Sequence, residues 1–402
     1  MVTAAKPSLE LLRSLTDEHV LRELMQANRL TRADLAARSG LSKPTVGESV
    51  RRLTGAGLVV DTGERTPGGR GRGRVGSYYA LADTVGTALA ISIAPGGVVA
   101  ERIDAHGDVL TRTRHDISRP ARPEQVAAAL RTAAAQAQED AGGPSRLAVV
   151  SAADPVERAT GRLIRLPDAP FLLGELDPVD VLAPQVAGPV TVDNDVNWAA
   201  QAERDTDPTN LSDFAYVFLG EGLGCAVVSD GEIRRGHAGV AGEIAHLITI
   251  GPHGQATRFI EVFAELDLRR AGTTAIDVDR LLQLANAREP SATAARHAVG
   301  HAISGVLAAI VALTDPRLVI LGGPWGSHPA ILDAITAAFT RMPRHVEVRG
   351  AQLTEEPSLT GARTDALNRL RSAIIAIPHR APSSATRTSA TGSLNEPTHG
   401  HV

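Results

Sequence analysis

Residues 29–62, RLTRADLAARSGLSKPTVGESVRRLTGAGLVVDT, place a glycine between two short helical patterns. Leu35 and Ala36 give the first pattern an apolar side, and Gly40 can take the positive φ that a sharp turn needs. Ser42 stands where a side chain would cap the second helix. The segment therefore predicts a helix-turn-helix.

The second helical pattern also predicts which side chains face outward. Val46, Val50 and Leu53 recur at i, i+4 and i+7, which is the spacing of a buried stripe. We expect the following residues on the outer side: Ser42, Lys43, Thr45, Ser49, Arg51 and Arg52. Hydroxyl and cationic side chains of this kind contact phosphates and base edges in a DNA major groove, so we predict that these six bind DNA.

A basic loop follows the two helices. Gly57-Leu58-Val59-Val60 predicts a short strand, and TPGGRGRGRVGSYYALA returns as a second strand, so the two make a wing. Arg70, Arg72 and Arg74 alternate with glycine in the loop, a slim backbone that fits a narrow minor groove. A solvated cationic linker is the alternative. The position directly after a helix-turn-helix favours DNA contact.

Length and composition bound the remaining possibilities. A chain of 402 residues with 43% apolar and 21% charged residues predicts two or three globular domains. No run approaches the roughly 18 apolar residues of a membrane span, and MVTAAKPSLELLRS lacks the apolar core of a signal peptide. We therefore expect a cytoplasmic protein without a membrane partner. The single cysteine, Cys225, excludes an internal disulfide.

Charge is distributed unevenly along the chain. Residues 1–80 hold 13 Lys and Arg against 8 Asp and Glu, whereas residues 81–402 hold 28 against 37. A basic small domain on an acidic large body is expected of a DNA-binding domain fused to a ligand-sensing or oligomerising module.

From residue 84 onward, strand patterns alternate with helical ones. Three strands, a helix, a strand and a helix occur twice in succession, which predicts an α/β protein of two lobes with a cleft between them. Beyond residue 378 the chain is polar and rich in Ser, Thr and Pro, so we expect disorder there. The predicted domains are a mainly α winged helix-turn-helix over 1–81, the two-lobed domain over 82–378 and a tail over 379–402.

The expected elements of the two-lobed domain follow from periodicity and turn residues. Strands are expected at 88–94, 97–104, 108–116, 146–153, 189–195, 214–220, 224–230, 231–236 and 317–323. Helices are expected at 123–141, 196–204, 257–271, 276–287, 292–313 and 328–341.

Polar residues capable of binding a ligand cluster in the middle of the chain. Asn194 and Asp195 follow a predicted strand, and ligand sites of α/β folds lie at the carboxyl ends of strands. An Asx turn with a helix cap is the alternative there. Glu243 and His246 offer a carboxylate and an imidazole for neighbouring hydroxyls of a polyol. The glycine run 220–224 is typical of a phosphate-binding turn or of a plain hairpin.

The order of these motifs resembles the ROK family, named for repressors, open reading frames and kinases. VDNDVNWAAQAE, FLGEGLGCAVVSDGEIRRGHAGVAGEIAH and LTDPRLVILGG carry the resemblance, which spans about residues 17–345. The resemblance implies an actin-like, hexokinase-like cleft and a homodimer or homotetramer. It also implies that the sugar contacts are Asn194, Asp195, Glu243, His246 and Glu261, with Asp195 at the position of the kinases' catalytic base.

The chain departs from the kinase members of that family at the ATP site. Their Asp-x-Gly-x-Thr phosphate loop corresponds here to residues 92–96, SIAPG, and Glu221 stands between the first glycines of the second loop. A carboxylate beside a polyphosphate is repelled, so we expect poor ATP binding and no kinase activity. Asp154 replaces a glycine of the family, and Asp168 corresponds to a sugar-contacting asparagine of the family. The family's loop near adenosine corresponds to Gly322-Gly323.

The family's zinc module is also absent from this sequence. Members with structural zinc use one histidine and three cysteines, whereas the corresponding stretch here reads ITIGPHGQATRFIE. His246 and His253 cannot replace three thiolates, so we predict no metal. A surface or capping role is then the alternative for His246 and Glu261.

These patterns together predict a sequence-specific transcriptional regulator, a repressor of carbohydrate-related genes. Its partners would be a double-stranded DNA operator and a sugar or sugar-phosphate effector, with no cofactor. One alternative is an ATP-dependent sugar kinase with a DNA-binding head. The other is an oligomerisation scaffold that binds no small ligand.

Overall fold

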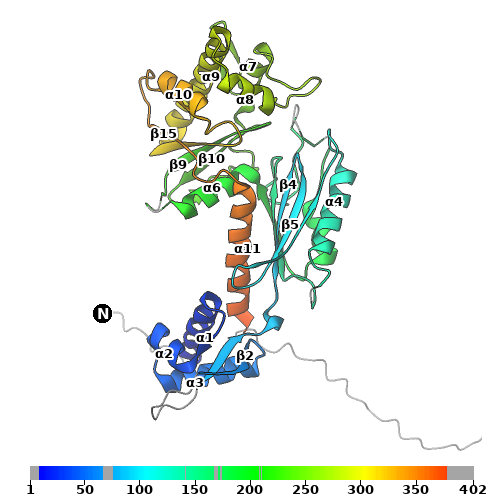
Figure 1. Ribbon diagram of the computed structural model, residues 1–402, viewed down its shortest axis with the longest axis vertical. Coiled ribbons are helices and arrows are strands. Elements are labelled where there is room, and N and C mark those ends of the chain that lie inside the picture. Colours follow the sequence, from blue (N-terminus) through cyan, green and yellow to red (C-terminus); the bar gives the residue numbers. More distant parts are fainter. Residues whose placement is uncertain are drawn as a thin grey trace, which may run out of the picture. The chain divides into compact units, whose positions relative to one another are not determined.

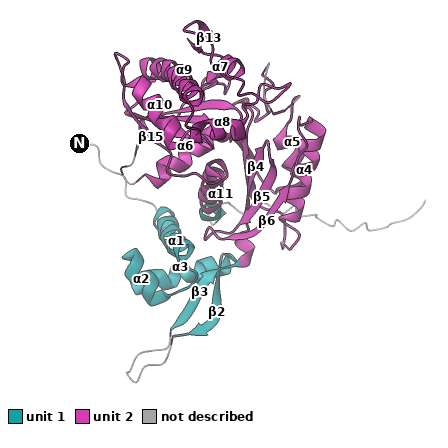
Figure 2. Cartoon of the chain, turned by 45° about the horizontal axis from the view of Figure 1, so that its top comes forward, with its two compact units in different colours: residues 1–82, 372–402 teal, residues 83–371 magenta. Residues whose placement is uncertain are grey.

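The computed structural model describes residues 9–66, 76–140, 142–166, 171–172, 174–207, 209 and 211–377. The chain forms two compact units (Figure 2), one of residues 1–82 with 372–402 and one of residues 83–371. The wing residues Arg70, Arg72 and Arg74 and the predicted tail 379–402 lie outside the described residues.

The N-terminal unit is a winged helix-turn-helix, as predicted. Its helices are α1 (Leu9–Gln26), α2 (Arg32–Ser39) and α3 (Lys43–Gly55). Its antiparallel sheet has the order β1-β3-β2, from β1 (Leu30–Thr31), β2 (Val59–Arg65) and β3 (Ser77–Leu81). Gly40 ends α2 with a φ of 70°, and the Ser42 hydroxyl accepts the Thr45 N–H at 3.3 Å to cap α3.

The buried face of α3 is wider than the sequence predicted. Val46, Val50 and Leu53 are buried as expected, but Ser49 is also fully buried. The Ser49 hydroxyl donates to Asp17 of α1 at 2.5 Å, and Arg52 donates to the same carboxylate at 2.7 Å. The prediction that Ser49 faces outward is therefore wrong, because a buried carboxylate on a neighbouring helix draws its side chain inward, whereas Arg52 contacts the same carboxylate and stays partly exposed.

The first lobe of the larger unit is a five-stranded mixed sheet (Figure 1) of order β6-β5-β4-β7-β8. Its strands are β4 (Ala88–Ala94), β5 (Gly97–Ile103), β6 (Val109–His115), β7 (Leu147–Ala152) and β8 (Val190–Asn194). Its helices are η1 (Asp83–Val85), α4 (Pro123–Gln136), α5 (Pro178–Leu182) and η2 (Ala183–Gln185). β4 to β6 are antiparallel neighbours, whereas β4, β7 and β8 run parallel.

The second lobe repeats this arrangement with the order β11-β10-β9-β14-β15. Its strands are β9 (Phe214–Leu219), β10 (Leu223–Ser229), β11 (Glu232–Ile233), β14 (Leu318–Gly322) and β15 (Glu347–Gly350). Its helices are η3 (Ile244–His246), α7 (Phe259–Glu265), α8 (Val278–Asn286), α9 (Pro290–Thr314) and α10 (Pro329–Phe339). The predicted repeat of three strands, a helix, a strand and a helix is confirmed.

Helix α6 (Asp195–Thr206) contacts both sheets and so ties the lobes together. Its Trp198 indole N–H donates to the Val150 carbonyl of β7 at 3.0 Å, while Val196, Ala199 and Ala200 pack against the second sheet. Helix α6 therefore lies between the two sheets, and Asp195 is its first residue.

Within the part of the chain that the structure describes, one helix is long and apolar enough to cross a membrane, judged by length and composition alone. This helix is α9, with 25 residues and a mean hydropathy of 1.6 in its most apolar stretch. Val299, Ile303 and Leu307 of α9 are fully buried in the core of the second lobe, where α9 packs against α10. Core helices of globular domains share this composition.

Several elements differ from the sequence prediction. The helix expected at 257–271 begins at Phe259 and ends at Glu265, and Asp267 follows with a φ of 55° that a helix cannot accommodate. The sequence did not indicate helix α11 (Pro357–Ala376), whose last residues group with the N-terminal unit. Gly361 lets α11 approach α6, because a Cβ there would lie 2.0 Å from the Trp198 carbonyl oxygen.

Candidate functional site

A cavity of about 470 Å³ opens within the larger unit. Its walls come from the turn after β4, the turn after β7, the start of α6, the β9–β10 turn, the loop before η3 and the start of α11. Four of the five predicted sugar contacts line it: Asn194, Asp195, Glu243 and His246. The structure thus brings together residues that the sequence places about 50 positions apart.

Asn194 has a structural role at the cavity floor. Its side-chain oxygen accepts the Val196 N–H at 3.0 Å and caps α6, as the helix-cap alternative predicted. Its amide nitrogen lies 3.4 Å from the Ala152 carbonyl oxygen and 3.3 Å from that of Asp154. Because both N–H groups are engaged, Asn194 fixes the turn after β7 and leaves an oxygen lone pair for a ligand.

Glu243 is positioned by a close contact between backbones. Gly242 has a φ of 96°, and a Cβ there would lie 1.7 Å from the Cys225 carbonyl oxygen, so only glycine fits. The Cys225 N–H in turn donates to the Gly242 carbonyl at 2.9 Å. This contact holds the following carboxylate against β10, while His246 is exposed at the cavity rim.

The structure does not bring Glu261 to the cavity. Its carboxylate forms ion pairs with Arg258 and Arg269, each at 3.0 Å, and the residue is absent from the cavity lining. The expected role as the last sugar contact therefore has no support in this geometry. The capping and surface alternative fits the two ion pairs better.

Three carboxylates of the cavity have strongly raised pKa values. Burial raises the pKa of Asp195 and that of Glu243 to about 7, and the Asp195 charge adds to the effect on Glu243. Burial and then the charges of Asp195 and Glu243 raise the pKa of Asp154 to about 7. Near neutral pH these three carboxyl groups are therefore partly protonated.

An ion pair joins the two turns that correspond to the kinase phosphate loops. One guanidinium nitrogen of Arg119 donates to both Glu221 carboxylate oxygens, at 2.5 and 2.7 Å, and its Nε donates to the Pro95 carbonyl at 3.0 Å. Arg270 also contacts Glu221, at 3.1 Å. The sequence analysis missed both arginines, because nothing in the local pattern links residues 102 positions apart.

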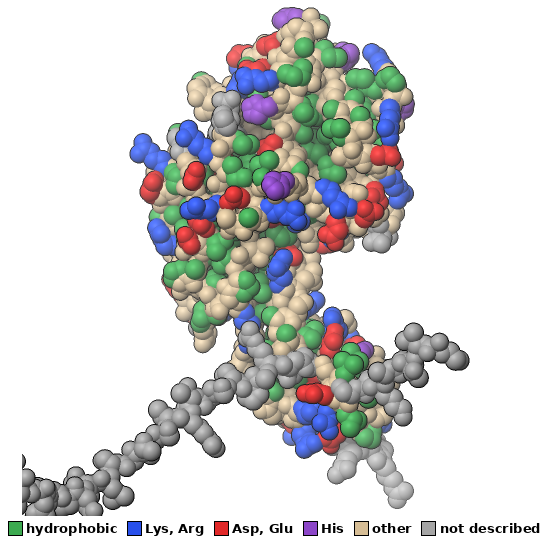
Figure 3. Space-filling view, turned by 180° about the vertical axis from the view of Figure 1, so that it is seen from behind, with side chains coloured by type: hydrophobic (Ala, Val, Ile, Leu, Met, Phe, Trp, Pro, Cys, Tyr) green, Lys and Arg blue, Asp and Glu red, His purple; other side chains and the backbone are tan. Residues whose placement is uncertain are grey.

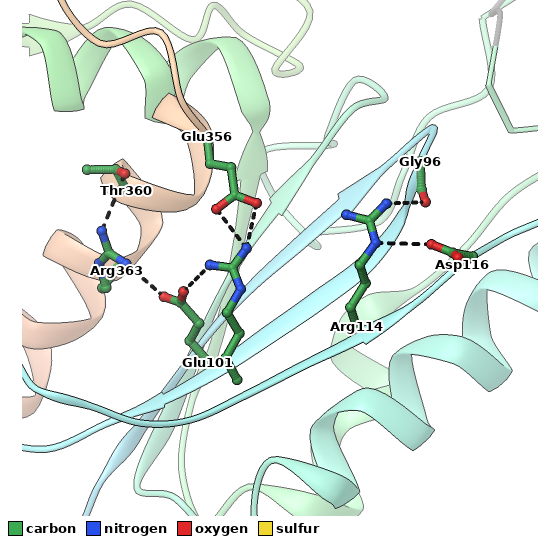
Figure 4. Close-up of polar contacts among 8 residues, drawn as sticks. Gly96, Glu101, Arg114, Asp116, Glu356, Thr360 and Arg363 are labelled. Atoms are coloured by element: carbon green, nitrogen blue, oxygen red, sulfur yellow. Dashed lines mark hydrogen bonds and ion pairs between the residues drawn. The ribbon is translucent and has the colours of Figure 1, made fainter.

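A second ionic network attaches α11 beside the cavity (Figure 4). Glu101 of β5 is 1% exposed and accepts hydrogen bonds from Arg112 at 2.6 Å and from Arg363 of α11 at 3.0 Å. Arg112 also donates to Glu356, which lines the cavity just before α11. The start of α11 is thus fixed to the first sheet through a buried carboxylate.

A hairpin stands where zinc-containing members of the family have their cysteines. Its strands are β12 (Ile248–Ile250) and β13 (Ala256–Arg258), and the Thr249 hydroxyl donates to the Ala302 carbonyl at 2.6 Å. Among the described residues, no three His, Cys, Asp or Glu side chains gather where one metal ion could be held. The expected absence of structural zinc stays a prediction.

The candidate DNA-binding surface is smaller than predicted. Of the six residues proposed on and before α3, Ser42, Lys43 and Arg51 are exposed and Thr45 is half-buried. Arg51 forms an ion pair with Glu48, and this carboxylate offsets part of the positive charge of the surface. On the larger unit, by contrast, basic and acidic side chains are interspersed over the face shown in Figure 3.

The raised pKa of Asp154 predicts how stability depends on pH. Its folded-state pKa of about 7 exceeds the unfolded value of 3.8, so this group's contribution to stability is lost as pH rises from about 4 to about 7. Asp154→Asn removes the ionisable group and should raise the melting temperature by about 2 °C or more at pH 8, and by less at pH 5. Differential scanning fluorimetry measures both values. The exposed Asp230→Asn change is the control, and an equal shift at both pH values would contradict the electrostatic account.

The sequence and fold match known proteins on both units. Residues 90–364 match the model of the ROK family, and residues 13–60 match that of winged helix-turn-helix DNA-binding domains. An N-acetylmannosamine kinase of Escherichia coli O157:H7 is 28% identical over 292 residues, which cover 69% of this chain and 97% of the kinase.

Two solved structures share the fold. A ROK family transcriptional regulator, a homologue of the E. coli MLC protein, superposes with a TM-score of 0.62 at 18% identity and covers 91% of this chain and 98% of its own. A ROK family glucokinase from Streptomyces griseus, in complex with glucose and AMPPNP, gives a TM-score of 0.55 at 23% identity, covering 70% and 99%. The family match spans most of the chain, so this protein belongs to the ROK family and carries a winged helix-turn-helix DNA-binding domain.

Proposed function

We propose that this protein is a transcriptional repressor of carbohydrate-related genes whose cavity senses a sugar or sugar phosphate and catalyses no phosphoryl transfer. The observation that carries the proposal is the Arg119–Glu221 pair between the two turns at the phosphate-loop positions, in a chain that also has a DNA-binding domain. The sugar part draws on the relatives, which are named as kinases of N-acetylmannosamine and of glucose.

The ion pair weighs against ATP in two ways. Glu221 brings a carboxylate to the turn where the phosphates would lie, and repulsion between like charges is strong in a cleft. The guanidinium groups that could offset phosphate charge, those of Arg119 and Arg270, are already paired with Glu221. A nucleotide would have to break these contacts before it could gain its own.

Control of DNA binding would follow from occupancy of the cavity. A ligand that binds one lobe arrangement better shifts the population toward that arrangement, and in a homodimer or homotetramer this changes the spacing of the DNA heads. Such a regulator acts in the cytoplasm, with the operator and the effector as its partners.

One observation favours the kinase alternative. Asp195 lies at the start of α6 in the cavity, and its pKa of about 7 suits a general base that works near neutral pH. The same raised value follows from burial alone, so it is compatible with a vestigial base. Catalysis also needs a bound polyphosphate, which the paired turns disfavour.

Phosphoryl transfer is tested by turnover. Purified protein with ATP, Mg²⁺ and a panel of hexoses and N-acetylhexosamines should hydrolyse ATP no faster than its Asp195→Asn variant. A coupled assay for ADP measures this. Sugar-dependent turnover that disappears in Asp195→Asn would establish the kinase and overturn the regulator-only account.

The DNA-binding surface is tested by the salt dependence of operator affinity. Lys43→Ala and Arg51→Ala should each weaken binding and reduce the slope of log K against log salt by about 1, because each phosphate contact releases about one counterion. The triple change Arg70→Ala, Arg72→Ala and Arg74→Ala should reduce it further. Fluorescence anisotropy on an operator selected from genomic DNA provides the measurement.

The control for this experiment is Arg22→Ala. Arg22 is an exposed arginine of α1, paired with Glu18, and lies outside the proposed surface. The proposed DNA-binding surface would be refuted if the α3 and wing variants had wild-type operator affinity and salt slope. An equal loss of affinity in Arg22→Ala would also refute it.

A further inference from the structure

Asp154 is a buried carboxylate with an unused oxygen. It lies in the turn after β7, lines the cavity and is 2% exposed. Its Oδ2 has no hydrogen-bond partner among the described residues. A buried acceptor without a partner costs free energy, so a group that satisfies it when a ligand binds contributes strongly to affinity.

The surroundings of Asp154 carry negative charge. Asp195 and Glu243 line the same cavity, and their charges add to the effect of burial in raising the pKa of Asp154. The arginines of the cavity lining are committed elsewhere: Arg114 contacts Asp116 and the Gly96 carbonyl (Figure 4), and Arg119 is paired with Glu221. Neither arginine pairs with Asp154, Asp195 or Glu243, and their pKa values of about 7 mean that near neutral pH these carboxyl groups are only partly ionised until a cation binds.

A neutral sugar compensates this charge poorly. Hydroxyl groups can donate hydrogen bonds to ionised carboxylates, but they bring no charge into a site of low dielectric. A protonated amine brings one positive charge and three N–H donors, and its attraction to a carboxylate is strengthened by burial. Among the residues that the structure describes, no three acidic, His or Cys side chains converge on a point where one metal ion would fit. A protonated amine does not need such a convergence of side chains.

We propose that the cavity recognises an amino sugar, a hexosamine with a free protonated amine, and that Asp154 accepts a hydrogen bond from its ammonium group. This inference rests on the proposed sugar-sensing function and specifies its ligand class. Asp195 and Glu243 then bind hydroxyl groups of the same ring. Asp154 Oδ2 gives the specificity for a free amine, because an acetylated nitrogen carries no positive charge to pair with this carboxylate.

Isothermal titration calorimetry at pH 7 tests the ligand class. The probes are glucosamine, mannosamine and galactosamine, each beside its N-acetyl derivative and its parent hexose, with MgCl₂ and CaCl₂ alone as further probes. At least one hexosamine should bind wild-type protein at least tenfold more tightly than its two counterparts. This comparison among ligands uses only the wild-type chain and is unaffected by any folding defect of a variant.

The residue is tested with two variants. Asp154→Asn should weaken hexosamine binding at least tenfold and change N-acetylhexosamine binding less than threefold. Asp230→Asn is the matched control, because its exposed carboxylate lies at a left-handed turn position that asparagine also accepts, and it should bind like wild type.

The outcomes distinguish the amino-sugar proposal from the proposed sugar-sensing function on which it rests. Binding of a hexose or N-acetylhexosamine without a preference for the amine would overturn the amino-sugar proposal and leave sugar sensing in place. Binding of Mg²⁺ or Ca²⁺ that is lost in Asp154→Asn would overturn it in favour of a metal site. If none of the sugars binds, the amino-sugar proposal and sensing of these free sugars both fail, whereas sensing of a sugar phosphate is decided by the operator-affinity measurement.

Discussion

The ion pair between Arg119 and Glu221 links the two lobes of the large unit beside the cavity. It joins the turn after β4 to the β9–β10 turn, which are contributed by different lobes, and Arg270 reinforces it. Both residues are partly exposed, so the pair adds little to global stability. Its position matters for the proposed function, because it places a paired carboxylate at the turns that correspond to the kinase phosphate loops.

At the other end of the cavity, the carboxyl groups have no arginine partner among the described residues of the lining. Asp154, Asp195 and Glu243 line that end, and each has a raised pKa. Holding three carboxyl groups close together is unfavourable, and the packing of α6 and of the loop before η3 keeps them in place. Buried, underpaired groups are typical of ligand sites and uncommon in pure scaffolds. This end of the cavity therefore supports the proposed ligand sensing over a role in oligomerisation alone.

Local patterns predicted the elements well and the contacts between distant segments poorly. Gly40 and the apolar stripe of α3 were visible in the sequence, as was the repeated strand order of the two lobes. The inward turn of Ser49 was not, since it depends on Asp17 of another helix. Helix α11 was missed, although its buried side chains recur at helical spacing: Leu359, Ala362, Ala366, Leu370 and Ile374. The grouping of Asp195 with Glu243 came from the family resemblance, whereas the partner of Glu221 could come only from the structure.

The central claim is that ligand in the cavity of the larger unit controls DNA binding by the winged helix-turn-helix. The most direct measurement is the affinity of the full chain for an operator selected from genomic DNA, by fluorescence anisotropy, with and without saturating sugars and sugar phosphates. The account predicts that at least one of them changes the operator Kd tenfold or more, and that Asp195→Ala and Glu243→Ala lose this response while unliganded affinity stays near that of wild type. An operator affinity that no sugar or sugar phosphate changes, with both variants indistinguishable from wild type, would contradict it.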